Sequence, residues 1–392
     1  MTRARALVLF ARSVPAGLHR SVADTVVSRL PLTASRVPEF IRRNRYAAFW
    51  LEDYGSMSYM NDWREAFGSA SRLSVDMCNI NDLLDLPRAL RRIRDYELVV
   101  VLHSAAGDNL GPLRRASASL QRRRGPLVVF FGNEYDRMPE KIGFARDVGA
   151  EFIASQLPIE SARWLYAECV SASVLPAPAA LAPEVFHETG GERPIDIGFR
   201  GALYGDPFAL GDEERTGLLR YFAERAGSMG LVSDIKYERD AAPEWAAFLN
   251  RCKGTIGAES GTHYLERDDS TRRKVVAYVG DHPGATFGDV FERFFAAYLN
   301  PVSGKAISSR HFEPIGTKTC QILLEGDYNG ILRPDRDYIC LKKDYSNIDD
   351  VVRRFRDHSY RSELVDEALE RVLAEHTYAH RVSSVLDAIL GR

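Results

Sequence analysis

Two short apolar runs constrain the fold of this chain most. They are Tyr96–Leu102 (YELVVVL) and Pro126–Phe131 (PLVVFF). Both are continuous and rich in β-branched or aromatic residues, as is typical of strands that are buried on both faces of a parallel sheet. Ala6–Phe10 and Phe152–Ala154 are further candidate strands, and Tyr46–Leu51 is another. Helical patterns separate these runs, and strands that alternate with helices predict an α/β doubly wound sheet.

A second strand–helix series follows a break in the pattern. The break, Ala177–Pro194, holds three prolines and two glycines and shows no apolar periodicity, so it is interpreted as a linker. The length of 392 residues suits two domains. We therefore predict a first domain at residues 1–180 and a second at residues 194–392. Tyr264–Asn300 interrupts the second series and is interpreted as an insertion or lid.

Composition excludes several classes of protein. The net charge is only -2, so no overall field attracts the chain to nucleic acid or anionic lipid. The five cysteines show no CxxC spacing and are odd in number, which argues against a disulfide framework or a zinc site and for a reducing cytoplasm. The first apolar run, Ala6–Ala11, is far too short for a signal or membrane segment, and no other run is long enough to span a bilayer. No cofactor motif is present.

The segment Gly304–Ser346 carries the strongest functional signal. It is predicted to hold a short helix that begins at Glu313, a buried strand, a loop rich in Gly and Asn, and a shorter strand. A helix N-terminus carries partial positive charge and free N–H groups, so phosphates bind there. A carboxylate at that place can accept hydrogen bonds from a sugar diol. The alternative is that Glu313 only complements the helix dipole.

This segment resembles a known family. Arg310-His311-Phe312-Glu313, followed by Cys320–Leu324 (CQILL), resembles the carboxyl-terminal domain of GT-B glycosyltransferases, in particular the spore-maturation (CgeB-like) group of the family-1/4 type. Ile197–Gly201 (IGFRG) is similar to the first strand and phosphate-side loop of that domain. The resemblance covers roughly residues 194–390, by the two-domain reading of the pattern.

The resemblance implies a fold and a reaction. The fold is two Rossmann-like domains that face a cleft. The second domain binds a nucleotide-sugar donor, a UDP- or GDP-sugar, and the first binds a small-molecule or glycan acceptor. Transfer needs no metal, and Glu313 binds the ribose hydroxyls. Two positions depart from the family motif: Lys305 occupies the place of the first of its two glutamates, and the usual glycine of its turn falls on Lys318, while Gly316-Thr317 comes two residues earlier. The alternative is a nucleotide- or sugar-binding protein on this scaffold that has lost catalysis.

Further candidate donor contacts follow strand ends, where ligands of parallel sheets gather. Arg200 and Gly201 come directly after a buried strand; the arginine can fork onto a diphosphate, and the glycine lets the backbone approach. Glu259 also follows a strand and is expected to line the base or sugar site. The alternative for each is an ordinary turn residue.

Other candidates are cations that lie near Glu313 in the sequence. They would stabilise a leaving diphosphate without a metal, or would merely be solvated. These residues are Lys305, Arg310 and His311.

The first domain offers two candidate bases. His103 and Glu134 lie just beyond the two strongest strands, where an acceptor hydroxyl would need a proton acceptor. Each alone is more often a loop or capping residue. Asp268 and Asp269 are the first candidates for a metal site, although their spacing is not diagnostic.

Overall fold

A computed structural model describes residues 3–14, 17–30, 49–50, 54, 57, 59–203 and 211–391. Within these ranges the chain forms two compact units. Unit 1 comprises residues 1–155, 166–176 and 382–392, and unit 2 comprises residues 156–165 and 177–381. The chain therefore passes between the units four times. The segment 156–165 and the predicted linker both belong to unit 2, whereas the end of the last helix belongs to unit 1.

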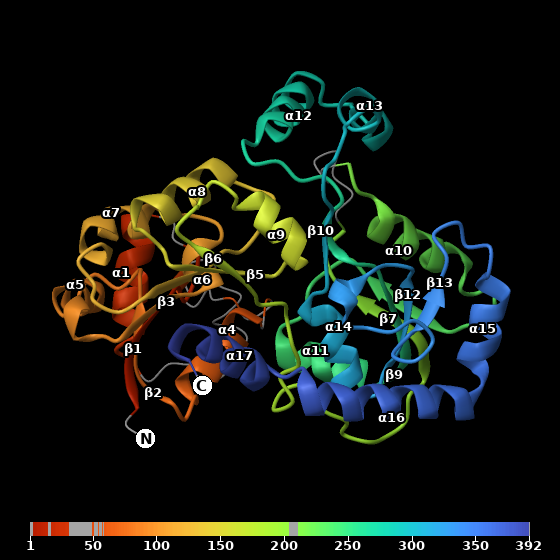
Figure 1. The fold of residues 1–392 in the computed structure, drawn as a ribbon. Helices are drawn as coiled ribbons and strands as arrows, with labels where there is room; N and C mark the ends of the chain where they lie inside the picture. Colours follow the sequence, from red (N-terminus) through yellow and green to blue (C-terminus); the bar gives the residue numbers. More distant parts are fainter. Residues whose placement is uncertain are drawn as a thin grey trace. The chain divides into compact units, whose positions relative to one another are not determined.

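Unit 1 contains a six-stranded parallel sheet, seen in Figure 1. The strand order is β2-β1-β3-β4-β5-β6. The strands are β1 (Ala4–Phe10), β2 (Leu73–Asn79), β3 (Leu98–Val101), β4 (Leu127–Phe130), β5 (Phe152–Ser155) and β6 (Ser173–Pro176). The helices are α1 (Leu18–Val27), α4 (Tyr59–Gly68), α5 (Asp85–Arg91), α6 (His103–Ala106), α7 (Gly111–Leu120), α8 (Met138–Asp147) and most of α17 (Tyr378–Leu390). The predicted strand Tyr46–Leu51 lies mostly outside the described residues.

Unit 2 contains a five-stranded parallel sheet of order β13-β12-β9-β7-β8. Its strands are β7 (Ile195–Arg200), β8 (Ser233–Lys236), β9 (Cys252–Gly257), β12 (Cys320–Leu324) and β13 (Ile339–Leu341). The helices of unit 2 include α9 (Ile159–Leu165), α10 (Glu214–Arg225), α11 (Ala242–Leu249), α14 (Ser309–Gly316), α15 (Ile348–Arg356) and α16 (His358–Glu375). The predicted α/β class with two Rossmann-like units is confirmed.

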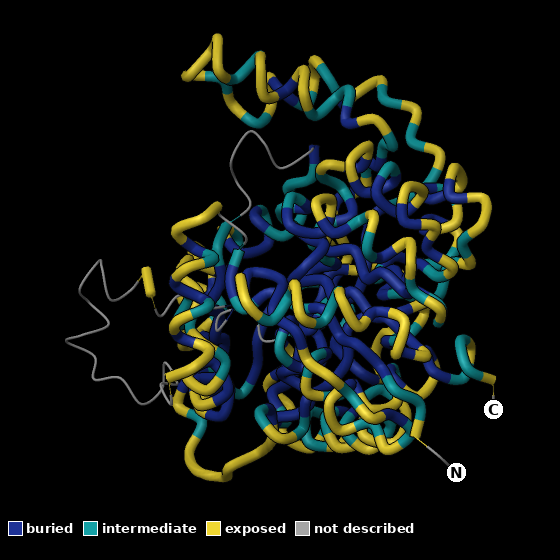
Figure 2. The backbone as a smooth tube through the Cα atoms, turned by 90° about the vertical axis from the view of Figure 1, so that its left-hand side faces the viewer, coloured by how far each residue is buried: buried dark blue, intermediate teal, exposed yellow. Residues whose placement is uncertain are grey.

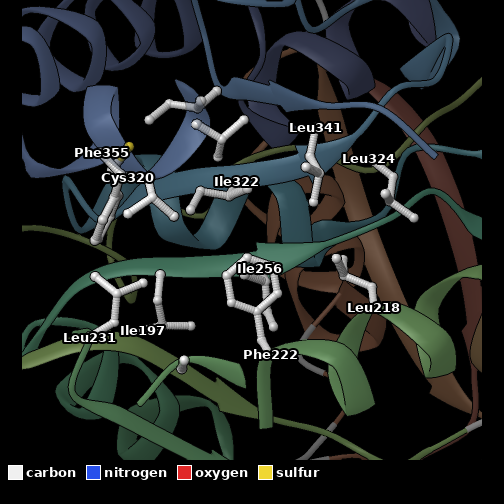
Figure 3. Close-up of a cluster of buried hydrophobic side chains, with 14 of the residues drawn as sticks. Ile197, Leu218, Phe222, Leu231, Ile256, Cys320, Ile322, Leu324, Leu341 and Phe355 are labelled. Atoms are coloured by element: carbon white, nitrogen blue, oxygen red, sulfur yellow. The ribbon is translucent and has the colours of Figure 1, made fainter. Parts of the chain in front are cut away.

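The core of unit 2 explains why these segments form a sheet with helices on its faces. Ile197, Ile256 and Ile322, one from each central strand, are fully or almost fully buried. Helices supply Leu218, Phe222 and Phe355 against the strands, as Figure 3 shows. The strands can be apolar throughout because both faces of a parallel sheet are covered.

The predicted insertion is a hairpin that carries two helices. The antiparallel pair β10 (Ser260–Thr262) and β11 (Gly304–Ala306) forms its base. Between these strands lie α12 (Ser270–Asp281) and α13 (Phe287–Phe294), which share a small core of their own around Val275 and Val290. Both helices, at the top of Figure 2, are otherwise mostly exposed or intermediate.

Candidate donor site and acceptor-side carboxylate

The strand order of unit 2 places a ligand site at one edge. The chain runs from β7 outward to β8 and then returns to the other side of β7 with β9. Ligands of such sheets bind outside the carboxyl ends of the strands where the order reverses. Here β7 ends at Arg200 and β9 is followed by Ala258 and Glu259. We call the carboxyl ends of β7, β9 and β12 the donor edge.

Helix α14 brings Glu313 to a buried position, but not at the helix start. Ser308 is the N-cap and His311 closes a capping box with it, so the helix begins at Ser309. The prediction that Glu313 begins the helix is therefore wrong, because Ser308, five residues earlier, supplies the cap. Glu313 lies one turn inside and is 4% exposed.

One aromatic and one charged side chain contact the carboxylate of Glu313. Its Oε2 accepts a hydrogen bond of 2.7 Å from the indole Nε1 of Trp245 on α11. Arg310 lies one turn earlier on α14, with its Nε 3.7 Å from the same oxygen and its guanidinium 4.6 Å from the centre of the Trp245 ring. Arg310 also donates to the carbonyl of Arg200 at the end of β7. The carboxylate, the indole and the guanidinium thus form one cluster that joins α11, α14 and β7.

His311 is a structural residue that fixes α14 to the donor edge. Its Nε2 lies 3.0 Å from the carbonyl of Ala258, to which it donates, and its Nδ1 accepts from the N–H of Ser308 at 2.9 Å. Burial lowers the pKa of His311 to about 4, so the ring is neutral at pH 7. The positive charge expected from His311 is therefore not supplied.

Lys305 is buried in an ion-pair network beside the donor edge. Its Nζ lies 2.5 Å from Asp212 and 2.9 Å from Glu214. Lys343 contributes a second ammonium at 2.6 Å from Glu214. Although burial acts in the other direction, these two lysines lower the pKa of Glu214 overall. A phosphate at Lys305 would compete with these two carboxylates for the ammonium.

Glu259 follows β9 and is nearly buried, with 9% exposure. Its Oε1 accepts from the N–H of Tyr328 at 2.8 Å. Burial raises the pKa of Glu259 above its usual value. Gly326 lies beside it: a Cβ there would lie 2.5 Å from the other carboxylate oxygen, so a larger residue would move the Glu259 side chain. Strand β12 and the loop after it therefore close around this acid.

Arg200 is occupied within the sheet. Its guanidinium donates to the carboxylate of Asp234 at 2.8 Å and stacks on Phe248, with 3.6 Å between the guanidinium carbon and the ring centre. The residue is 6% exposed. A fork onto a diphosphate would break the pair with Asp234, which disfavours the predicted role of the Arg200 side chain.

Gly316 and Thr317 lie at the opposite end of the sheet from the donor edge. Arg193, just before β7, donates to the carbonyl of Thr317 at 2.6 Å. A Cβ on Gly316 would lie 2.3 Å from the carbonyl oxygen of Phe186. Their predicted role in nucleotide binding is corrected here, because α14 runs back toward the amino ends of the strands before β12 begins. An open groove of about 580 Å³ lies between the loop 184–192 and α11 and includes Arg251, just before β9, so it is also not at the donor edge.

The two candidate bases of unit 1 differ in their surroundings. His103 is 1% exposed and packs among Trp63 and Phe130, with ring centres 5.7 and 5.2 Å away. Among the described residues neither ring nitrogen has a hydrogen-bond partner, and burial lowers the pKa of His103 to about 3. It is a neutral core histidine, which disfavours the predicted role as a base.

Glu134 lies beyond the carboxyl end of β4 and is 6% exposed. Its Oε1 accepts from the hydroxyl groups of Ser155 at 2.7 Å and Tyr166 at 2.8 Å. Burial and the adjacent Glu134 raise the pKa of Tyr166, so the phenol keeps its proton and donates. The carboxylate is held in a fixed place, which suits a residue that must accept a proton in one geometry.

Trp245, Ser155 and Tyr166 were not predicted as site residues. Trp245 lies in an apolar helix, so its sequence pattern predicts a core residue. Its hydrogen bond to Glu313 becomes visible only in the structure, where α11 and α14 pack together. Within the described residues no group of three or more His, Cys, Asp or Glu side chains could hold a metal ion. The same part of the chain has no helix with the length and apolar character needed to cross a membrane.

The comparisons agree with the sequence-based class. Residues 244–387 match the model of a family described as "Glycosyl transferase-like". This stretch begins in α11 and includes β9, α14 and β12, so it covers Trp245, Arg310 and Glu313. The predicted resemblance to glycosyltransferases is confirmed over these residues. The CgeB-like subgroup stays a prediction. A comparison with curated proteins finds no match.

Solved structures of similar shape include several sugar-transferring proteins. One is a sucrose-phosphate synthase from Thermosynechococcus elongatus, with 10% identity, a TM-score of 0.49 and 99% of each chain covered. Another is T4 phage BGT in complex with its UDP-glucose substrate, with 11% identity, a TM-score of 0.49, and 98% of this chain and 99% of that chain covered. A glycosyltransferase from Rickettsia africae ESF-5 shows 8% identity, a TM-score of 0.46, and 100% and 99% coverage. All three TM-scores are below 0.5, so the fold assignment rests on the two parallel sheets themselves.

Proposed function

We propose that this chain transfers a sugar from a nucleotide-activated donor, a UDP- or GDP-sugar, to a small-molecule or glycan acceptor. The donor binds at the donor edge of unit 2. The observation that carries the proposal is that the family match includes the cluster of Glu313, Arg310 and Trp245, at the edge where the strand order of unit 2 predicts a ligand.

Glu313 is proposed to bind the ribose diol of the donor. An ionised carboxylate accepts several hydrogen bonds through its two oxygens, so it can keep the indole of Trp245 and also take a diol. Because the carboxylate is already held in position, binding the diol costs less conformational entropy.

Arg310 and the N-terminus of α14 are proposed to stabilise the leaving diphosphate. The guanidinium is held against the Trp245 ring, and the helix dipole adds partial positive charge at the same end. Lys305 is a second cation, available if phosphate displaces Asp212 or Glu214. On this basis we propose transfer without a metal ion.

Glu134 is the proposed base for the acceptor hydroxyl. Like His103, it lies beyond a strand end, but unlike His103 it is already ordered by two hydroxyl donors. Ligands of a parallel sheet approach that edge. Acceptor binding is accordingly assigned to unit 1.

A nucleotide screen tests the proposal. Thermal unfolding of the full chain is measured with UDP, GDP, ADP, CMP and dTDP, since a ligand that binds only the folded state adds about 2.7 kcal/mol of stability at 100 times its Kd. We expect UDP or GDP to raise the melting temperature, and the matching nucleotide-sugar to release nucleoside diphosphate slowly in water. No stabilisation by any nucleotide would refute donor binding. Stabilisation without any release or transfer would favour the non-catalytic binding protein.

A further inference from the structure

The segment Gln156–Leu165 belongs to unit 2, and the unit 1 residues on either side of it both contact Glu134. Ser155 precedes the segment and Tyr166 follows it, and these are the two hydroxyl donors to Glu134. Tyr166 is 2% exposed and stacks on Phe131, so it has little freedom to move independently of the chain. The segment is thus flanked directly by both hydrogen-bond donors of Glu134.

Three polar contacts hold the segment in unit 2. Asn329 donates from Nδ2 to the carbonyl of Gln156 at 2.9 Å. The hydroxyl of Ser161 donates to the carbonyl of Ser303 at 2.7 Å. Arg267 donates to the carbonyl of Trp164 at 2.8 Å and lies 4.3 Å from the centre of its ring. These contacts attach the segment to loops of unit 2.

Of these contacts, the one through Asn329 also reaches the donor edge. The Oδ1 of Asn329 accepts from the N–H of Ile307 at 2.8 Å, and Ile307 directly precedes the N-cap of the helix that carries Glu313. Tyr328, the preceding residue, donates its N–H to Glu259. Asn329 has a φ of 56°, a left-handed conformation that asparagine tolerates better than most residues. One side chain therefore joins both donor-edge carboxylates to the segment.

We propose that Asn329 is a positioning residue that couples nucleotide binding at the donor edge to the placement of Glu134. The route runs from Glu259 through Tyr328 and Asn329 to Gln156, and from the adjacent Ser155 to Glu134. The proposal rests on the proposed function, because it takes a nucleotide as the ligand and Glu134 as the base. Binding that fixes α14 and the loop after β12 would fix Asn329, and hence the carbonyl of Gln156. A coupling of this kind must be reciprocal and measurable as a change in affinity or in local opening.

Hydrogen exchange followed by mass spectrometry tests the coupling in the full chain. Peptides that cover residues 150–166 are compared with and without the nucleotide that gives the largest thermal shift among UDP, GDP, ADP, CMP and dTDP. We expect the nucleotide to slow their exchange by about 5- to 150-fold, the usual range of coupling between two sites. The variant Asn329→Asp keeps an oxygen for the N–H of Ile307 and tolerates the same φ, but cannot donate to Gln156. In this variant the nucleotide should still bind and the slowing should be lost.

Ser161→Ala is the matched control. It removes a different contact of the same segment, to Ser303, which does not involve Asn329. Exchange of residues 150–166 should be faster at baseline in this variant and should still slow when nucleotide binds. In a donor-hydrolysis assay, Asn329→Asp should lower kcat and leave the KM of the donor nearly unchanged, because only Glu134 is displaced.

The outcomes separate this proposal from the one on which it rests. If no nucleotide binds the wild type, the proposed function fails and the coupling with it. If nucleotide binds but residues 150–166 do not respond, the coupling is refuted while donor binding stands. Equal slowing in wild type and Asn329→Asp would refute the role of Asn329.

Discussion

Replacing Glu313 with glutamine separates its structural role from its role toward the nucleotide. The amide is of nearly the same size, and its oxygen can still accept from the indole of Trp245 across the 2.7 Å contact. The loss is the negative charge. Hydrogen bonds to charged groups contribute about 1.5–3 kcal/mol, so Glu313→Gln should weaken nucleotide binding about 10- to 150-fold. The free energy of unfolding should change much less.

Trp245→Phe makes the complementary change. It removes the indole donor and leaves the 4%-exposed carboxylate of Glu313 without that partner. The free energy of unfolding should fall by about 1.5–3 kcal/mol, because a buried charged acceptor loses its hydrogen bond. The carboxylate itself remains for the ribose diol, so nucleotide affinity should fall less than in Glu313→Gln.

Calorimetry with the best nucleotide gives the affinities, and thermal unfolding without nucleotide gives the stabilities. Glu224→Gln is the control, since it makes the same substitution at an exposed position in the last turn of α10, away from the donor edge. It should change neither quantity. An unchanged Kd in Glu313→Gln, with normal unfolding, would show that Glu313 serves only to hold Trp245 and would remove the main support for the donor site.

Three further predictions follow from the same structure. Donor hydrolysis or transfer should survive EDTA; loss of turnover that Mg²⁺ or Mn²⁺ restores would refute metal independence and make Asp268 and Asp269 the first residues to test. The contribution of His103 to the free energy of unfolding should be full above about pH 6.5 and fall as the pH decreases toward 3, because its folded-state pKa is about 3 and the unfolded chain takes up the proton first. This group alone accounts for a slope of about 1.4 kcal/mol per pH unit. Thermal melts of His103→Phe should lack this part of the slope. A fragment of residues 177–392 should bind nucleotide without transferring sugar. Residues 194–392 should be markedly less stable, because they lack Leu181, whose N–H donates to the carbonyl of His376. Nucleotide binding by residues 1–180 instead would reverse the assignment of donor and acceptor.

The central strands were predictable, and of the four edge strands of the two described parallel sheets only β13 was expected from the sequence. β3 and β4 are buried at every position, so their sequences are continuous apolar runs. β2, β6 and β8 lie at the edges of the sheets, where one side faces solvent, and their sequences LSVDMCN, SVLP and SDIK mix polar and apolar residues. Such short edge strands form because a neighbouring strand offers hydrogen bonds, which no local pattern in the sequence records.

The candidate site shows the same division between local and long-range information. Glu259 was predicted correctly to follow a strand, since strand ends can be read from the apolar pattern. The helix start was misplaced at Glu313, because Ser308 and His311 form a capping box that does not follow the common Ser-to-Glu spacing. The environment of His103 could not be predicted either: nothing next to it in the sequence reveals that Trp63 and Phe130 enclose it.

The most consequential residues that sequence reasoning passed over are those of ordinary type in short segments. Asn329-Gly330 reads as a tight turn, and the turn is present, with Asn329 in the left-handed conformation. The same conformation directs the amide toward both Ile307 and Gln156, which lie 22 and 173 residues away in the sequence. A turn residue can therefore satisfy its local pattern completely and still join two distant parts of the chain. For this reason the exchange behaviour of residues 150–166, rather than any further motif, decides whether the two carboxylates Glu259 and Glu134 act together.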